Sequence, residues 1–496
     1  MNRKTFWTLF IIAAALRIFM IGRAPLWYDE NFTLILARLP FVDMIKATAG
    51  DVHPPLWYII EWTIYHIAPG LPAWAIRIPA LTFSLLAIVM FVHVCNTLHI
   101  PPRVQTVAAA MMAIMPMQIW YAQEGRMYAM LEFLVLATLW TGLTRKWTWY
   151  FIASLAMLYT QNYGVFYLAV ICFVLLVLHP EDIKEILTTS GTAGLLFLPW
   201  VIVIARQMTE IDGRYWIMDI SAGAVLGSIY KQFWSSSMLT PGVVGSYIVT
   251  FVLLIIGVYA ISRGRIKAWW SVLAMAFLPL GLAWLASILW QPLLLFRPLI
   301  GISPFLYIIV AWPVNWLYEL RYEIWEKPST RFKIGPTAYA SAFVFPLLIL
   351  GIGGYYQNVA AMKGEGAVSP LLETLAYVRA HWQPGDVIYY TDDGPMINLM
   401  PYAADLPQFR MPACEEKTGY APVLGSLSDA TREAIGSRIA EFDDVTRSRA
   451  WVFAPRSPLH PTCYEDQIKD IAAGSPLILV DDNQYLTSGV WLVEAE

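Results

Sequence analysis

The residues best suited to chemistry lie in two short stretches near the start of the chain. Residues 27–30 read WYDE and place two adjacent carboxylates just past the first apolar segment. Residues 51–58 read DVHPPLWY and combine a carboxylate, an imidazole, two prolines and two aromatic rings. A carboxylate beside an apolar wall can act as a general base toward a hydroxyl, and an imidazole changes charge near neutral pH. We therefore predict acid–base chemistry here, against the simpler interpretation of two ordinary polar loops.

These residues receive separate roles, because adjacent side chains in a loop usually point apart. We assign the proton transfer to Asp29 and a supporting part in catalysis to Glu30. His53 is predicted to bind a phosphate or, together with Asp51, a metal ion. The alternative is that Asp51 only caps a helix that begins at the two prolines. Tyr58 is expected to support substrate binding.

Two arginines stand in apolar surroundings. Arg17 lies inside the first apolar segment, where a charge is costly and is usually paired or functional. It is close enough to the end of that segment to reach the interface, so a structural and a functional role are both open. Arg297 follows residues 291–296 (QPLLLF) and needs an anion or a carboxylate as partner. We predict a lipid phosphate there.

Polar residues also gather between two later apolar segments, at Gln123, Glu124, Arg126 and Tyr128. On a helix start, Gln123 and Arg126 would share one face. An arginine in that position can bind a phosphate through two parallel hydrogen bonds. The alternative is an interfacial turn held by a pair of Glu124 and Arg126.

The composition is that of a membrane protein. The chain has 496 residues, of which 58% are hydrophobic and only 14% charged, with a mean hydropathy of +0.54. Soluble domains carry about 25% charged residues. We predict a polytopic α-helical protein with about eleven membrane-spanning segments. These segments are 5–22, 76–94, 104–121, 127–143, 147–160, 163–179, 187–206, 243–262, 268–290, 297–316 and 334–354.

Other function classes find no support in the sequence. The net charge is −3 and Lys and Arg form no block, which argues against nucleic-acid binding. The sequence contains no Walker-type phosphate loop, no GxGxxG and no CxxC pair, so ATP hydrolysis, dinucleotide chemistry and zinc ribbons are unsupported.

The basic residues predict the orientation. More Lys and Arg fall in the short loops on the side of the N-terminus than in the longer loops on the other side. Cytoplasmic loops carry such an excess, so we predict a plasma-membrane protein with a cytoplasmic N-terminus. An odd number of spans then places the C-terminal domain outside. The polar clusters named above lie on that outer face, as does Tyr163 of residues 161–163 (QNY), which we add as a supporting residue.

The chain divides into two regions by composition. Residues 1–356 form the predicted transmembrane domain, with a large first outer loop at 23–75, and residues 357–496 form a more polar tail. Alternating helix and strand patterns predict a small extracytoplasmic α/β domain in the tail. Its expected helices are 369–382, 429–441 and 466–473, and its expected strands are 387–390, 450–454, 477–480 and 490–493. A disulfide between Cys414 and Cys463 is left open.

The ordered set of motifs resembles the GT-C-type polyprenyl-phosphate-sugar glycosyltransferases, which include the protein O-mannosyltransferases and the aminoarabinose transferase of lipid A. The matching features run over about residues 1–310: Arg17, Asp29-Glu30, residues 53–58 (HPPLWY), residues 77–81 (RIPAL), residues 123–128 (QEGRMY) and Arg297. The chain departs from the family at residues 161–163, where members often carry a His-Tyr pair, and at Pro298, where an aromatic residue is usual.

The resemblance implies an integral membrane enzyme that moves a sugar from a polyprenyl phosphate to a hydroxyl of a lipid, glycan or protein acceptor, with inversion. It implies that Asp29 is the catalytic base, with Glu30 beside it. It also implies that His53, Arg126 and Arg297 bind the phosphate of the donor. No cofactor is certain, and a divalent metal is left open. The competing hypotheses are a transporter or flippase for lipid-linked sugars and a non-catalytic membrane subunit with a docking tail.

Overall fold

The computed structural model describes residues 1–211, 221–234, 243–263, 269–290, 292–324, 370–390, 393–410, 438–439, 449–455, 477–479 and 488–493. The chain forms two compact units. The helical unit comprises Met1–Ile21, Arg77–Val201 and Ile217–Met362. The mixed unit comprises Gly22–Ile76, Ile202–Trp216 and Lys363–Glu496. The segment between the first two predicted spans thus shares a unit with the C-terminal residues.

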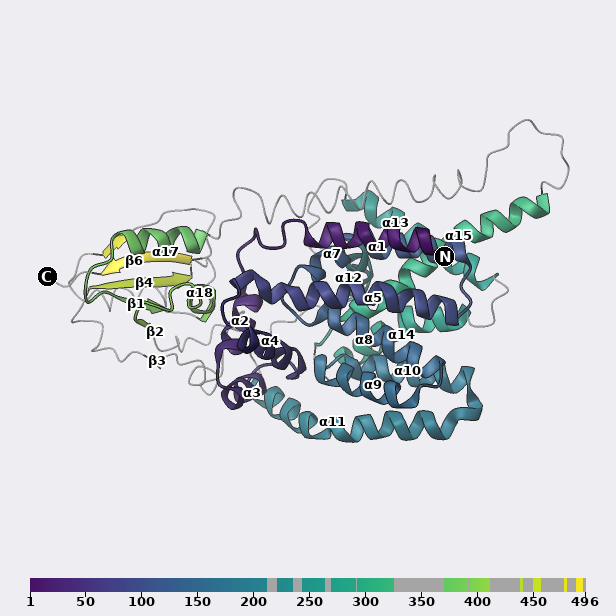
Figure 1. Cartoon of the computed structure of the whole chain (residues 1–496), viewed down its shortest axis with the longest axis horizontal. Coiled ribbons are helices and arrows are strands. Elements are labelled where there is room, and N and C mark those ends of the chain that lie inside the picture. The colour runs from purple at the N-terminus through teal and green to yellow at the C-terminus, as the bar shows by residue number, and fades with distance from the viewer. Residues whose placement is uncertain are drawn as a thin grey trace, which may run out of the picture. The chain divides into compact units, whose positions relative to one another are not determined.

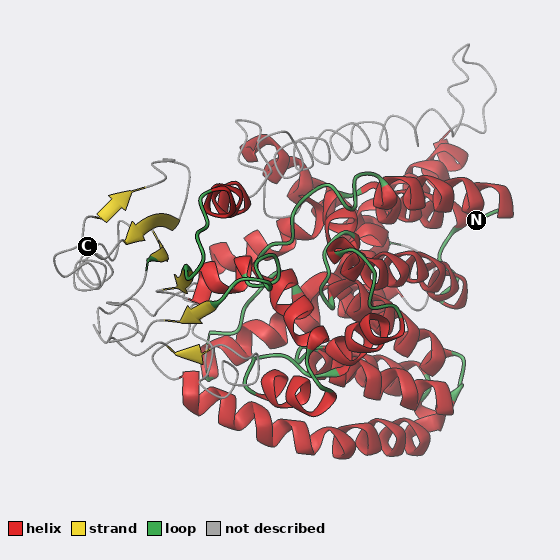
Figure 2. Ribbon diagram, turned by 60° about the vertical axis from the view of Figure 1, so that its left-hand side comes forward, coloured by secondary structure: helices red, strands yellow, loops and turns green. Residues whose placement is uncertain are grey.

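The helical unit is built from helices packed along their lengths (Figure 2). They are α1 (Arg3–Ile18), α5 (Ile78–Thr97), α6 (Pro102–Ile114), α7 (Pro116–Ala122), α8 (Tyr128–Leu143), α9 (Trp147–Thr160), α10 (Gly164–Leu178), α12 (Ala222–Trp234), α13 (Val243–Ser262), α14 (Trp269–Leu289) and α15 (Ser303–Ile324), with α11 (Ile183–Ile211) running on into the mixed unit. Short 3-10 turns η2 (Pro180–Asp182) and η3 (Pro298–Ile302) precede α11 and α15.

Several of these helices can cross a bilayer. By length and composition, five of the described helical segments qualify: Ala73–Thr97, Pro180–Gln207, Gly245–Ser262, Trp269–Leu289 and Pro298–Trp316. Two shorter apolar helices, Tyr128–Leu143 and Gly164–Leu178, accompany them. The prediction of a multi-pass α-helical membrane protein is confirmed. The predicted break between 147–160 and 163–179 is confirmed as well, whereas the segment 334–354 lies outside the described residues.

One predicted span is two helices. The segment 104–121 breaks at Met115, whose ψ of 138° is extended, so α6 ends at Ile114 and α7 begins at Pro116. The cause is steric, because a proline pushes the preceding residue out of the helical region.

Two other helices approach closely: a Cβ on Gly257 of α13 would lie 2.2 Å from the carbonyl oxygen of Ile309 in α15. Small residues allow such backbone contact between membrane helices.

The mixed unit combines short helices with a sheet. Its helices are α2 (Tyr28–Arg38), α3 (Phe41–Ala49), α4 (Leu56–Ile67), α17 (Pro370–Ala380) and α18 (Asp393–Leu399), with the turn η1 (Ala73–Arg77) where this part of the chain ends. The segment predicted as a loop is therefore largely helical. Leu26, Leu34 and Ile76 form a small buried core within it, with Tyr65 packed against them.

The sheet has six strands in the order β3-β2-β1-β4-β6-β5. They are β1 (Val387–Tyr390), β2 (Gln408–Arg410), β3 (Arg438–Ile439), β4 (Ala450–Pro455), β5 (Leu477–Leu479) and β6 (Ser488–Val493). Strands β3, β2, β1 and β4 run parallel to one another, and β6 is antiparallel to β4 and β5. Helix α17 runs across one face of the sheet (Figure 1).

The predicted α/β domain is confirmed in α17, β1, β4, β5 and β6. The helix predicted at 429–441 is wrong at 438–439, where the chain forms β3 by pairing with β2. The helix predicted at 466–473, and Cys414 and Cys463, lie outside the described residues. A buried Asp386 accepts a hydrogen bond from the Trp451 ring nitrogen at 2.9 Å, which ties the β1 start to β4.

Candidate functional site

Asp29 and Glu30 lie in the first turn of α2 rather than in a loop, so that part of the prediction is wrong. Carboxylates in a first turn interact favourably with the helix dipole. Glu30 is buried, and its Oε2 accepts a bond from the Trp27 backbone amide at 3.4 Å. Asp29 is half-buried. Successive helical residues point about 100° apart, so Glu30 faces the interior while Asp29 faces a more open side.

Helix α4 begins directly after the two prolines, as predicted, with Pro55 as its N-terminal cap. The Tyr58 hydroxyl donates to Asp51 Oδ2 at 3.0 Å and so joins two predicted site residues. The N-terminal cap of α4 is Pro55, so Asp51 lies four residues before the cap position. His53 is half-buried in the bend between Asp51 and the prolines.

Glu61 of α4 is a buried carboxyl that the sequence did not single out. Its side chain is 3% exposed, and its Oε1 has no hydrogen-bond partner among the described residues. Burial raises the pKa of Glu61 well above its usual range, and the negative charge of Glu30 raises it further. The packing of α4 on α2 thus places a second buried carboxyl near Glu30.

Replacing Glu61 by Gln is expected to stabilise the protein at neutral pH. A carboxyl whose pKa is raised in the folded state stabilises the fold fully only below its unfolded value of about 4.3, and this stability is lost as pH rises toward the folded value. The amide of Glu61→Gln keeps the shape and cannot ionise. Thermal unfolding in detergent should show a higher melting temperature than wild type at pH 7.5 and a smaller difference at pH 5. An equal difference at both pH values would contradict the raised pKa.

In the helical unit, Arg17 is fully buried and caps a helix. Its guanidinium donates to the carbonyls of Met112 and Ala113 and to the Ser84 hydroxyl, each at 2.8 Å. Met112 and Ala113 lie in the last turn of α6, where carbonyls have no intrahelical partner. These bonds favour the structural role for Arg17, whose side chain is enclosed and does not reach an interface.

Gln123 has a similar task at the end of α1. Its amide nitrogen donates to three carbonyls at 3.2, 2.7 and 2.9 Å, those of Leu16, Arg17 and Phe19. Arg77 donates to the Ile21 carbonyl at 2.7 Å and holds the next turn of chain. Because Gln123 follows the end of α7 and precedes α8, the prediction that it shares a helical face with Arg126 is wrong. Gln123 and Arg77 fix the point where the chain leaves α1.

Glu124, Arg126 and Tyr128 lie close together in a buried turn before and at the start of α8. The Arg126 amide donates to the Glu124 carbonyl at 2.7 Å, and the Trp120 ring nitrogen donates to Glu124 Oε2 at 2.9 Å. The Tyr128 ring packs edge-on against Tyr121, with the ring centres 5.0 Å apart. A guanidinium held in such a turn suits an anionic group.

The backbone around Arg297 is held on both sides by buried side chains. Gln232 of α12 donates to the Phe296 carbonyl at 2.8 Å, and Tyr167 of α10 donates to the Pro298 carbonyl at 3.0 Å. The fit is tight, because a Cβ on Gly301 would lie 2.8 Å from the Tyr167 ring. Arg297 itself is half-buried. The fold therefore fixes the main chain of this arginine and leaves its side chain partly accessible.

Tyr163, predicted as a supporting residue, holds the same segment. It donates to the Leu293 carbonyl and accepts a bond from the Leu295 amide at 3.0 Å. Gln232 is also bound in turn: its Oε1 accepts from Ser303 at 2.9 Å and its carbonyl accepts from Tyr307 at 2.7 Å. Tyr163 and Gln232 thus belong to one support for residues 292–302.

Lys231 is a second cation beside Arg297 that the sequence analysis missed. Its ammonium lies 4.5 Å from the centre of the Phe296 ring. Burial lowers the pKa of Lys231, and the positive charge of Arg297 lowers it further. Two cations that disfavour each other's charge in a partly buried place are suited to bind a doubly charged anion.

Replacing Gln232 by Met should weaken the lipid-phosphate site predicted at Arg297. Met has a similar volume but no amide, so Gln232→Met leaves the Phe296 carbonyl and the Ser303 hydroxyl without these bonds. We expect the dissociation constant for a lipid phosphate to rise about tenfold. Gln105→Met is the matched control. Gln105 lies in the first turn of α6 and is also buried, but its amide donates to Asn96 and to the Ile100 carbonyl, away from Arg297. Equal losses in both variants would reduce Gln232 to a general packing role.

One group of possible metal ligands occurs in the described part of the chain, His179, Glu181 and Asp182. Arg145 forms ion pairs with both carboxylates, so a guanidinium already supplies the positive charge there. The group joins the α8–α9 turn to the α10–α11 turn. None of the predicted site residues belongs to it, and the divalent metal left open by the sequence gains no ligand set from it.

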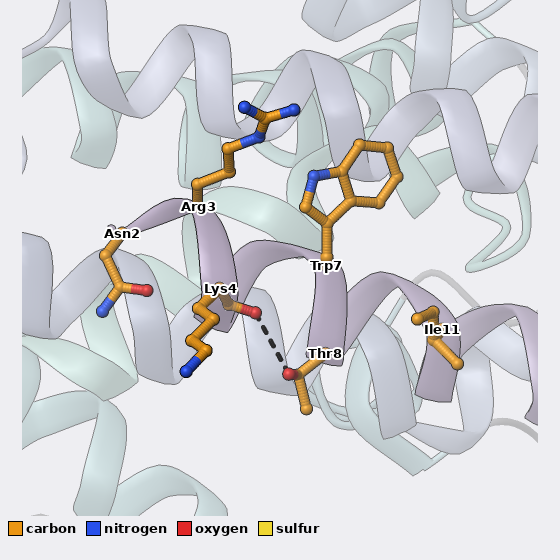
Figure 3. A pocket seen from close by; sticks show the side chains of 6 residues that line it. All are labelled: Asn2, Arg3, Lys4, Trp7, Thr8 and Ile11. Carbon is orange, nitrogen blue, oxygen red and sulfur yellow. Dashed lines mark hydrogen bonds between the residues drawn. The ribbon is translucent and has the colours of Figure 1, made fainter.

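A hollow lies along the N-terminal part of α1, lined by Asn2, Arg3, Lys4, Trp7, Thr8 and Ile11 (Figure 3). The Thr8 hydroxyl donates to the Lys4 carbonyl at 3.0 Å, and the other side chains spread along the helix (Figure 3). Basic and tryptophan side chains at a helix end are typical of a membrane interface. Because one helix supplies the whole lining and no predicted site residue takes part, this hollow is separate from the candidate site.

Comparison with known proteins finds solved structures of similar fold. No protein-family profile and no curated protein matches the sequence. Among solved structures, ArnT from Cupriavidus metallidurans in the apo state is similar with a TM-score of 0.60 and 14% sequence identity, over 99% of this chain and 98% of that chain. The same ArnT bound to undecaprenyl phosphate is similar with a TM-score of 0.57 and 14% identity, over the same 99% and 98%. ArnT is an aminoarabinose transferase of the GT-C type. Over 99% of its length, the chain therefore has the fold of ArnT.

Proposed function

We propose that this protein is an integral membrane glycosyltransferase that moves a sugar from a polyprenyl phosphate to an acceptor hydroxyl, with inversion. The observation that carries the proposal is the likeness to ArnT over nearly the whole of both chains, including ArnT bound to undecaprenyl phosphate. The acceptor is a lipid, a glycan or a protein, and the donor reaches the enzyme from the surrounding membrane lipids.

The reaction is one displacement at the anomeric carbon. The acceptor oxygen forms a bond to that carbon while the bond from the carbon to the phosphate oxygen breaks. Asp29 accepts the proton of the acceptor hydroxyl, and its place in the first turn of α2 leaves the side chain half-buried and partly exposed. Glu30 supports it from the interior, where it binds the Trp27 amide. Asp51 and Tyr58, which are bonded to each other, shape the neighbouring bend.

Negative charge develops on the departing polyprenyl phosphate, so cations are the groups that lower the barrier. We assign this charge stabilisation to Arg297 and Lys231 together, and to Arg126 and His53. Arg297 and Lys231 are supported by their proximity and by the fixed backbone around Arg297. Since phosphate is already a good leaving group, the reaction needs no nucleotide and no strong general acid.

The orientation predicted from the basic residues belongs to the same proposal. With the N-terminus in the cytoplasm, Asp29 and the cations act at the extracytoplasmic face of the plasma membrane. The α/β domain then lies on that face too. The likeness to ArnT bound to undecaprenyl phosphate supports a lipid-linked donor.

The test is a transfer assay with the purified full-length protein in lipid vesicles. Radiolabelled undecaprenyl-phosphate sugars are supplied with membrane lipid, glycan and peptide acceptors, and product is separated from donor. Transfer of label from at least one donor, with release of undecaprenyl phosphate, is the expected result. Movement of intact donor across the vesicle bilayer without cleavage would instead identify a flippase and overturn the proposal.

A further inference from the structure

The C-terminal domain contacts the helix that carries Asp29. Within the mixed unit α18 packs on α2, although Asn31 and Asn398 are 367 residues apart in the sequence. The Asn31 amide nitrogen lies 3.4 Å from Asn398 Oδ1 and 3.5 Å from its carbonyl oxygen, and donates toward both. Arg38, at the end of α2, donates to the Pro401 carbonyl at 3.4 Å. Contacts therefore run along α2 from its first turns to its last residue.

The closest support falls just before the first turn of α2. The Tyr402 hydroxyl accepts a bond from the Leu26 amide at 3.2 Å. The fully buried Asn31 donates to the Leu26 carbonyl at 2.9 Å. Both polar backbone groups of Leu26 are thus held by side chains, one of them from the C-terminal domain. Leu26 directly precedes the N-terminal cap of α2, Trp27, and so sets where the helix begins.

Tyr402 is itself fixed to the body of its domain. Its amide donates to the Leu399 carbonyl at 2.9 Å, which closes the turn after α18. Arg379 of α17 donates to the Tyr402 carbonyl at 2.9 Å and to both oxygens of Asp405 at 2.8 and 2.6 Å. The Arg379 guanidinium lowers the pKa of Asp405 to about 2, so this ion pair persists across the pH range of an assay. The backbone of Tyr402 is therefore held at its amide by Leu399 and at its carbonyl by Arg379.

We propose that Tyr402 and Asn398 are positioning residues that fix the first turn of α2 and, through it, the Asp29 carboxylate. The inference rests on the proposed function, because the step affected is the proton transfer to Asp29. A displacement of about 1 Å in a reacting group can cost about 100-fold in rate. Loosening α2 should therefore lower kcat and leave the KM for the donor lipid unchanged, since neither residue is assigned to the phosphate.

The experiment removes single groups from the full-length protein. Tyr402→Phe deletes only the hydroxyl that binds the Leu26 amide, and Asn398→Ala deletes the side chain facing Asn31. Hydrogen exchange followed by mass spectrometry should show faster exchange at the Leu26 amide and in the first turns of α2. Transfer kinetics should show kcat lowered about three- to tenfold, with unchanged donor KM. Tyr377→Phe, an exposed tyrosine on α17 of the same domain, should change neither measurement.

Two results would overturn the inference. Unchanged exchange in α2 for both variants would mean that the C-terminal domain does not hold this helix. Faster exchange with wild-type kcat would mean that α2 is held but Asp29 does not depend on it. Absence of any transfer by the wild-type protein would count against the proposed function and the kinetic part, while the exchange data would still decide whether the domain holds α2.

Discussion

Asp29→Asn is expected to abolish transfer, lowering kcat by about 10²–10⁴-fold. The amide has the size of the carboxylate and can still accept a hydrogen bond, but it cannot take up the proton of the acceptor. Donor binding should persist, because the phosphate is assigned to cations. The measurement is kcat in the vesicle assay together with the affinity for undecaprenyl phosphate, each compared with wild type.

Asp43→Asn serves as the matched control for that variant. Asp43 lies in α3 of the same unit, carries the same charge and only faces Lys46 across the helix surface at 3.9 Å. Wild-type kcat is expected there. If Asp29→Asn kept full activity, Asp29 would be removed from the mechanism, and the buried pair Glu30 and Glu61 would become the carboxyls to examine next.

Arg297→Gln should lower kcat/KM for the donor by about 10²–10³-fold, the range seen when one charge-stabilising group is lost. The effect should appear in both parameters, because the phosphate carries charge in the bound donor and more of it in the transition state. The backbone at this position should stay in place, since Gln232 and Tyr167 bind the carbonyls on either side. Steady-state kinetics with varied donor would measure the loss.

The control is Arg263→Gln, at the exposed end of α13, where the guanidinium lies 5.4 Å from the centre of the Tyr259 ring. It removes the same charge from the same unit and should leave both parameters unchanged. Raising the salt concentration distinguishes the two arginines further, because salt screens the interactions of the exposed Arg263 more than those of the half-buried Arg297. If Arg297→Gln showed normal donor kinetics, binding of the donor phosphate would be assigned to Lys231 and Arg126 instead of Arg297.

The long apolar helices could be predicted because about 20 apolar residues in a row suit a bilayer and little else. Helix α2 could not, because Glu30–Ala37 are all buried and show no polar face at helical spacing. The break at Met115 was readable in principle from Pro116, yet the apolar pattern continues across it. In the tail, β1 and β4 could be predicted from their runs of apolar residues, whereas β2 has only three residues, too few to show a pattern.

The candidate site was predictable in its residue types and less so in its partners. Arg17 and Gln123 stood out as polar residues near apolar segments, but they bind main-chain carbonyls, which a sequence does not display. Gln232 and Glu61 were missed because each lies in a mostly apolar helix. Their importance depends on neighbours far along the chain, such as Phe296, which is 64 residues from Gln232. A lone amide or carboxyl in such a helix is the signal to look for.

The bonds of Arg17 also constrain how the protein is made. α1 is synthesised before its bonding partners, because Ser84 follows Arg17 by 67 residues and Met112 follows it by 95 residues. Until α6 is synthesised, the guanidinium lacks the carbonyls of Met112 and Ala113, and a charge inside a membrane helix costs about 2.5–3.5 kcal/mol on the translocon scale. We therefore expect α1 to reach its final depth in the membrane only after α5 and α6 have been made, with packing against them completing its insertion.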